Sequence, residues 1–290
     1  MGRKQHYVWK KYLKAWADDS KKNIWTKIIN ENVIKLAGLT SVAQEAFFYE
    51  IGKLSEDEIA YCRRFGQRFS PFIRYYSEEL LKFYQAGSAG VKSTDGKTYL
   101  SNQFFEDIHS GIEELGLPLI SCKRIDDLRA IKKSPRNEDL IFLCTQYFRT
   151  RKMRTALVNG TKSSPLESAL FDKAFPYFSM LFASQATLFI IPRAKYIFVK
   201  NNTDVPFITT DQPVINLLKD ELDENRHVKE LKLYYPISPT NAFIICVDSN
   251  MEVFSEREID REEVVKLNTK MKQEAHNFIF ANNESELNAD

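Results

Sequence analysis

Helical patterns fill the middle of this chain, and β-rich segments flank them on both sides. Two short runs at residues 23–29 and 33–39 are separated by Asn30, Glu31 and Asn32, which predicts a hairpin. Five more β-rich runs follow after residue 191, at 196–199, 207–210, 214–217, 231–235 and 242–247. This order predicts an α+β fold in which the N-terminal hairpin and the C-terminal β-rich segment share an antiparallel sheet packed on a helical middle region.

Helix start signals divide the middle region. Ser55 followed by Glu58 forms a capping box that opens a long helical stretch. The strongest pattern begins at Asn137 and runs to about Val158, with apolar residues at helical intervals. Further helices are expected at 6–16, 41–49, 71–84, 103–115, 121–131, from 165 onward and at 260–277.

The chain is long enough, at 290 residues, to bury one large core or two modest ones. Because strands from both ends are expected in one sheet, we predict a single domain spanning residues 1–282. The polar residues 283–290 are expected to form a disordered tail.

Several features indicate a cytoplasmic protein with no membrane partner. Basic residues interrupt the first apolar stretch, which argues against a signal peptide. The longest apolar run, Phe175–Ile191, is broken by polar residues and by Pro176, and fits a buried helix better than a membrane span. The four cysteines lack CxxC spacing, which is typical of free thiols in a reducing compartment.

Charge is distributed unevenly along the chain, although the formal net charge is only +2. The N-terminal arm and residues 123–154 are basic, whereas the chain from Asp248 onward is acidic. A basic central helix can bind the phosphates of RNA or DNA. The alternative is an ordinary solvated helix surface.

The segment from Pro206 to Pro213 places a carboxylate at the end of a strand. An apolar run leads into Thr209, Thr210 and Asp211, and Pro213 then stops the strand. A carboxylate at such a point is commonly functional, or it serves as an Asx-turn residue.

Blocks spread over nearly the whole chain resemble the DUF4238 family. They are Gln5-His6-Tyr7-Val8, the segment 43–49, Gln146-Tyr147-Phe148-Arg149-Thr150, the segment 207–213, and Tyr235-Pro236-Ile237-Ser238-Pro239. Two positions depart from the family pattern, with Trp9 in place of proline and Gln212 in place of asparagine. The resemblance implies a bacterial, mostly cytoplasmic group of proteins, some of them associated with defence, and it supplies positions rather than a reaction.

Four residues in these blocks are candidate catalytic residues: His6, Gln146, Arg149 and Asp211. Histidine can act as general acid or base, and arginine binds phosphate through a planar fork of donors. Gln146, Arg149 and Thr150 are expected on one helix face, and Asp211 is expected to orient the histidine, bind a metal or pair with Arg149. Alternatively, the same polar residues hold a helix to the sheet.

Candidate substrate-binding residues are Tyr7, Thr150, Arg154 and Thr210. No metal ligands are assigned, because the histidines and cysteines lack metal-ligand spacing. A divalent ion remains an open possibility for the cofactor, with Glu45 joining Asp211 as a second carboxylate.

The sequence favours an enzyme acting on a phosphate-bearing substrate, a nuclease-like hydrolase or toxin-like effector of a defence system. The alternative is a non-catalytic module that binds a protein or nucleic-acid partner and whose polar residues are structural.

Overall fold

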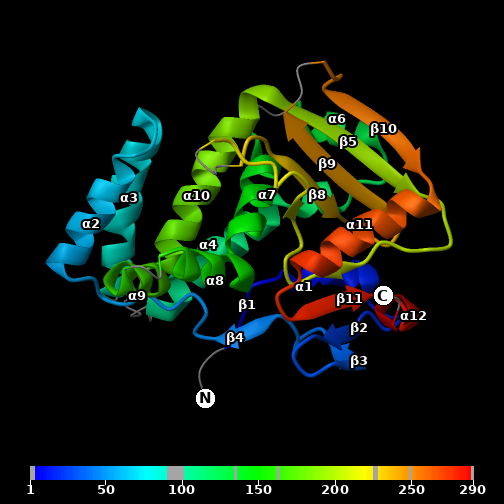
Figure 1. Cartoon of the computed structure of the whole chain (residues 1–290), viewed down its shortest axis with the longest axis horizontal. Coiled ribbons are helices and arrows are strands. Elements are labelled where there is room, and N and C mark those ends of the chain that lie inside the picture. Colours follow the sequence, from blue (N-terminus) through cyan, green and yellow to red (C-terminus); the bar gives the residue numbers. More distant parts are fainter. Residues whose placement is uncertain are drawn as a thin grey trace, which may run out of the picture.

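The computed structural model describes residues 4–89, 101–133, 136–161, 164–224, 228–247 and 250–288, with only the backbone of 101–105. The fold is α+β, as the sequence predicts: most helices of the middle region lie to one side, and two sheets built largely from the two ends of the chain lie to the other, together with the final helices (Figure 1).

The N-terminal region consists of short elements. They are β1 (Lys4–His6), α1 (Lys10–Leu13), η1 (Lys14–Trp16), β2 (Asn23–Ile28), β3 (Val33–Gly38) and β4 (Gln44–Ala46). The hairpin prediction is confirmed, because β2 pairs antiparallel with β3. The helix predicted at 41–49 is wrong: β4 pairs antiparallel with β1, and Ala43 and Phe47 have φ angles of 47° and 60°, outside the helical region.

The middle region is helical. Its elements are α2 (Glu56–Gly66), α3 (Pro71–Ser88), α4 (Ser101–Leu115), α5 (Leu117–Ile120), α6 (Ile125–Ile131), α7 (Glu138–Phe148), α8 (Arg151–Gly160), α9 (Pro165–Lys173), α10 (Phe175–Ile190) and η2 (Ile191–Arg193). The capping box at Ser55 is confirmed, with the Ser55 hydroxyl accepting from the Glu58 N–H and the Glu58 carboxylate accepting from the Ser55 N–H.

The larger sheet is built from the C-terminal half. Its strand order is β10-β5-β9-β8-β7, with bounds β5 (Ala194–Asn201), β7 (Ile215–Asn216), β8 (Lys232–Pro236), β9 (Asn241–Val247) and β10 (Phe254–Ile259). Strand β10 was not expected from the sequence, and it pairs parallel with β5, so this sheet is mixed.

The smaller sheet joins the two ends of the chain. Its order is β3-β2-β11-β6, where β6 is Thr209–Thr210 and β11 is Phe278–Ala281. The prediction that early and late strands share a sheet is therefore confirmed. The final helix α11 (Arg261–Glu274) is shorter than expected, because the chain turns into β11.

Two further segments are the C-terminal tail and the long apolar helix α10. Residues of the tail expected to be disordered form α12 (Ser285–Asn288), whose Leu287 is buried in a hydrophobic cluster with Ile279 and Ala281. Residues Phe175–Arg193 are long and apolar enough to cross a membrane by length and composition, and half of that window is buried. Helix α10 packs against α7 and α3, so its buried face is part of the core (Figure 1).

The N-terminal segment is fastened to the C-terminal strands by buried polar contacts. The indole N–H of Trp16 donates to the carbonyl of Phe207 at 2.7 Å. The hydroxyl of Tyr12 contacts the hydroxyl of Thr209 at 2.6 Å and donates to the carbonyl of Pro236 at 2.8 Å. These contacts hold the segment that follows β1 against β6 and β8.

Candidate functional site

The predicted helix 137–158 is broken at Arg149 and Thr150. Helix α7 ends at Phe148 with Arg149 as its C-cap, and α8 begins at Arg151 with Thr150 as its N-cap. The Thr150 hydroxyl accepts the backbone N–H of Met153 at 3.3 Å, which satisfies a free donor of the new helix. The expectation that Gln146, Arg149 and Thr150 share one face of a single helix is therefore wrong.

Arg149 is the largest charged side chain buried in the protein, with 1% of its surface exposed. Its Nη2 donates to the carboxylate of Glu113 in α4. Among the described residues, its Nε and Nη1 have no hydrogen-bond partner. Burial by itself lowers the pKa of Arg149, but Tyr49 and the Glu113 carboxylate outweigh it and raise the pKa, so the guanidinium stays charged. A buried cation with free donors is costly unless something else binds them.

Arg149 interacts electrostatically with His6 and Tyr49, and Gln146 precedes it by one turn on α7. Within the described part of the chain, His6 Nδ1, Tyr49 Oη and Gln146 Nε2 are buried without a hydrogen-bond partner. The Tyr49 ring lies 4.3 Å from the ring of His109, centroid to centroid. We call His6, Tyr49, His109, Glu113, Gln146 and Arg149 the Arg149 cluster.

The β1–β4 ribbon positions His6 and Tyr49. His6 is opposite Gln44 in the ribbon, and the N–H of Tyr7 donates to the carbonyl of Ala43 at 3.1 Å. The side-chain oxygen of Gln5 accepts the backbone N–H of Tyr49 at 2.8 Å. The strand that carries His6 thus also fixes the backbone of Tyr49.

Burial keeps most of the cluster uncharged. It lowers the pKa of His6, with Lys10 and Arg149 adding to the effect and a backbone hydrogen bond at Val42 opposing it. Burial and Arg149 lower the pKa of His109 well below its usual range. Burial raises the pKa of Glu113, although Arg149 opposes this shift. Neutral imidazoles beside a fixed guanidinium can accept a proton while an anion is held.

Asp211 is fully buried and does not pair with Arg149, so the expected ion pair between them is wrong. Its two carboxylate oxygens accept the backbone N–H groups of His276 and Asn277, both at 2.8 Å. Its own N–H donates to the carbonyl of Phe278 at 3.0 Å. Burial raises the pKa of Asp211 to about 6, and these backbone hydrogen bonds oppose the shift. Asp211 therefore holds the turn between α11 and β11.

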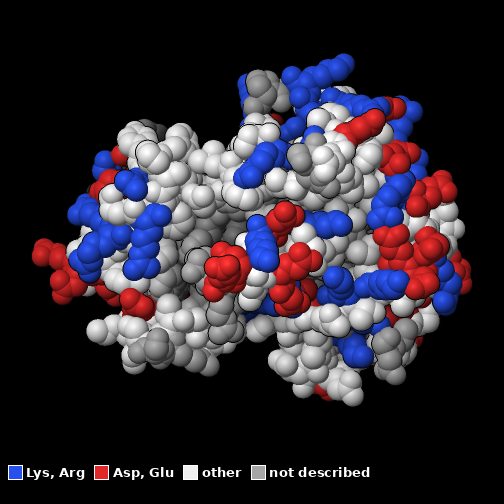
Figure 2. Space-filling view, turned by 45° about the horizontal axis from the view of Figure 1, so that its top comes forward, with Lys and Arg blue, Asp and Glu red and all other residues white. Residues whose placement is uncertain are grey.

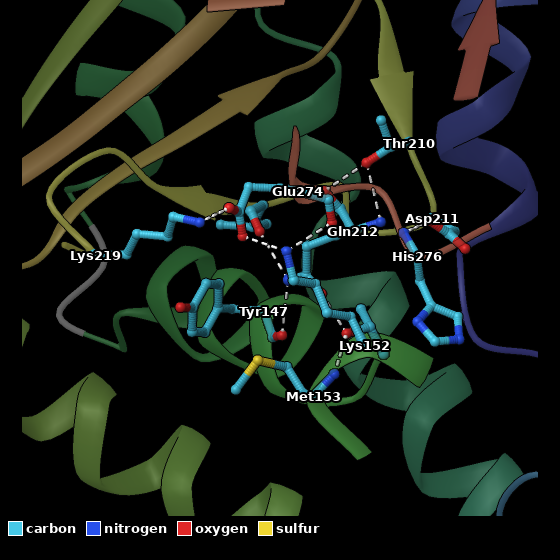
Figure 3. A network of polar contacts seen from close by, with 11 residues as sticks. Tyr147, Lys152, Met153, Thr210, Asp211, Gln212, Lys219, Glu274 and His276 are labelled. Atoms are coloured by element: carbon cyan, nitrogen blue, oxygen red, sulfur yellow. Dashed lines mark hydrogen bonds and ion pairs between the residues drawn. The ribbon is translucent and has the colours of Figure 1, made fainter. Parts of the chain in front are cut away.

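Gln212 connects the α7–α8 break to the strand segment (Figure 3). Its side-chain N–H donors reach the carbonyls of Tyr147 at 3.0 Å and Val214 at 2.8 Å, and its oxygen accepts from the Thr150 hydroxyl. The Thr210 hydroxyl donates to the Gln212 carbonyl at 3.0 Å. Thr150 and Thr210, both expected to bind substrate, are fully buried in this internal network.

Tyr7 and Arg154, also expected to bind substrate, are packed into the protein. Tyr7 is buried against Phe48, with ring centroids 5.1 Å apart, and burial followed by the Asp211 charge raises its pKa. Arg154 donates to Asp172 at 2.8 Å and lies over the rings of Phe48 and Phe175.

The basic residues of α8 are paired with carboxylates. Arg151 pairs with Glu45, Lys152 with Glu274 at 2.5 Å, and Arg154 with Asp172. Glu274 also pairs with Lys219, as Figure 3 shows. On the face drawn in Figure 2, acidic and basic side chains lie interspersed. These pairs weigh against α8 as a free phosphate-binding surface.

Metal ligands are not grouped in the described part of the chain. Among those residues, no set of three or more His, Cys, Asp and Glu side chains is arranged to hold a metal ion. Glu45, considered as a partner for Asp211, is bound to Arg151 instead.

The family model described as "Protein of unknown function (DUF4238)" matches residues 4–285, nearly the whole chain. The chain belongs to this family. This DUF4238 protein matches no curated protein and no solved structure. The family assignment adds no reaction, so the chemistry of the DUF4238 site must be argued from its own residues.

In this DUF4238 protein Arg149 acts on the pKa of His6, Gln146 lies one turn before Arg149 on α7, and Asp211 is held by other partners. Sequence reasoning missed Tyr49, His109 and Glu113. Tyr49 lies in a block that was singled out for its resemblance, but its role depends on tertiary contacts. His109 and Glu113 are one turn apart on α4, and two titratable residues on the buried side of a helix are the signal that could have identified them.

Proposed function

We propose that this protein is a nuclease-like hydrolase acting on a phosphate-bearing substrate at the Arg149 cluster. The observation that carries the proposal is the buried Arg149 guanidinium, which pairs with Glu113 and leaves Nε and Nη1 without partners among the described residues. Such a group is suited to bind an anion, because guanidinium donors match the oxygens of phosphate.

Roles follow from the chemistry of the side chains. Arg149 binds the phosphate, and Gln146 and Tyr49 supply neutral donors to its oxygens. His6, held neutral by burial, removes a proton from the attacking water or hydroxyl. His6 and Glu113 are the members that keep partial contact with solvent, so the substrate approaches from their side.

Asp211 has a supporting part in this proposal. It fixes the backbone of His276 and Asn277, and its charge acts on Tyr7, the residue after His6. Nucleic acid is then bound at Arg149 rather than along α8, whose basic side chains have partners.

One observation favours the alternative, a non-catalytic module that binds a protein or nucleic acid and whose polar residues are structural. Arg149 is almost wholly enclosed and already has one carboxylate partner, as a residue that joins two helices would. In that case its free donors contribute nothing to binding, and substitutions affect stability alone.

The test is to incubate purified protein with RNA and with DNA, with and without magnesium or manganese. We expect cleavage that His6→Asn and Arg149→Lys both abolish while the protein stays folded. Arg63→Ala is the matched control, since Arg63 forms an exposed pair with Glu78. Undiminished cleavage in both variants would show that His6 and Arg149 do not have the roles assigned to them.

The cellular setting is also part of the proposal: a toxin-like defence effector working in the cytoplasm. All four cysteines are free, as in a reducing compartment. Induced expression in a bacterium is expected to stop growth in the wild type and not in His6→Asn.

A further inference from the structure

The Arg149 cluster holds one buried cation, and one carboxylate already balances it. Glu113 binds Nη2 of Arg149, and its side chain is 15% exposed. The remaining members are neutral: His6 and His109 through their lowered pKa values, Tyr49 through its raised pKa, and Gln146 as an amide. The cluster therefore has no spare positive charge for an incoming anion.

Charged and titratable groups on the neighbouring elements do not change this balance. From α1, Lys10 acts on His6, and Lys11 pairs with Glu114 at 2.6 Å on the surface. On α4, Glu106 acts on Tyr49, and from β8 the neutral Tyr235 faces Glu113 and Arg149. Lys10 and Glu106 carry opposite charges, so they add no net charge to the cluster.

We propose that the cluster accepts a singly charged phosphodiester and discriminates against a doubly charged terminal phosphate, with Glu113, paired to Arg149, taking up the one compensating proton. This inference rests on the proposed function. A diester adds one negative charge beside Arg149, and a single proton on Glu113 restores neutrality. A terminal phosphate brings up to two charges and leaves one uncompensated in a dry site, which is costly.

Glu113 can supply that compensation. Burial raises its pKa, so it takes up a proton readily when an anion arrives. His6 and His109 have lowered pKa values, so both imidazoles are neutral before an anion binds and neither adds a resting positive charge. One proton at Glu113 thus matches one charge on the ligand.

The experiment is a calorimetric titration with two probes, a dinucleoside monophosphate carrying one diester and a nucleoside 5′-monophosphate. The protein carries His6→Asn, which prevents turnover and leaves the charge of the cluster unchanged. We expect the diester to bind at least about tenfold more tightly, as expected for one uncompensated charge. Adding Glu113→Gln is expected to strengthen both probes and to remove the pH dependence of diester affinity, because the amide needs no proton. Glu114→Gln, at the exposed neighbour, is the matched control.

The outcomes separate the inference from the proposed function. If neither probe binds, the proposed function fails and the inference fails with it. If both bind and the monophosphate binds as tightly as the diester, the inference fails and the function stands. The His6→Asn protein decides this comparison alone, even if Glu113→Gln does not fold. Diester affinity that falls as pH rises supports proton uptake, and a flat profile contradicts it.

Discussion

Arg149 at the end of α7 and Glu113 on α4 form an ion pair that joins two helices around a nearly inaccessible guanidinium. In the part of the chain that the structure describes, this pair leaves Nε and Nη1 of Arg149 without a hydrogen-bond partner. Substitutions at Arg149 and at Glu113 are therefore expected to change stability and activity to different extents.

Removing Arg149 is expected to destabilise the protein strongly. Arg149→Ala leaves the Glu113 carboxylate buried without its partner, and losing one member of a buried pair typically costs about 3–5 kcal/mol. Urea unfolding followed by circular dichroism measures this. Arg63→Ala, in an exposed pair, should cost far less, because solvent screens the interaction. If Arg149→Ala lowers the free energy of unfolding as little as Arg63→Ala does, Arg149 and Glu113 do not depend on each other in the folded protein.

Gln212 is expected to contribute stability without contributing to activity. Gln212→Ala removes donors to the carbonyls of Tyr147 and Val214 and the acceptor for Thr150. Leaving buried polar groups unsatisfied should lower the free energy of unfolding by about 2–3 kcal/mol. Thermal melts and the cleavage assay measure the two effects. A folded Gln212→Ala protein that has lost cleavage would place Gln212 in the site.

Asp211 is expected to make stability depend on pH. Its pKa is raised from 3.8 to about 6 in the folded protein, so the folded state binds the proton more tightly than the unfolded state. Its contribution is fully present below the unfolded pKa and is lost as pH rises through about 6, by up to about 3 kcal/mol. The measurement is urea unfolding across this range for wild type and Asp211→Asn. The difference between the two proteins should shrink with rising pH, and a constant difference would show that Asp211 does not titrate there.

Protonation of His6 is expected to cause the fall of kcat/KM at low pH. Burial, Lys10 and Arg149 lower its pKa below 6.5, so the limb of kcat/KM should lie below that value. Lys10→Gln should move the limb upward because one of the lowering charges is gone. Lys11→Gln should leave it in place, since Lys11 pairs with Glu114 at the surface. If Lys10→Gln leaves the acid limb of the pH profile unchanged, a group other than His6 causes that limb.

Local sequence signals determined most of the secondary structure. The capping box at Ser55, the hairpin at 23–39 and the helical period of the middle region are short-range patterns, and each is present in the fold. The family blocks also marked His6, Gln146 and Arg149 before any contact was known. Segment 41–49 and the helix across 149–150 were misjudged, because pairing with β1 and capping by Thr150 outweighed local helical preference.

Only the tertiary structure decided which polar groups meet. Sequence order says nothing about whether Arg149 pairs with Asp211 or with Glu113, since the choice depends on how α4 and β6 pack around the end of α7. That packing satisfied Asp211 with backbone N–H groups and left Arg149 with free donors. Long-range contacts in a dry interior determine both partners and protonation, and no local pattern encodes them.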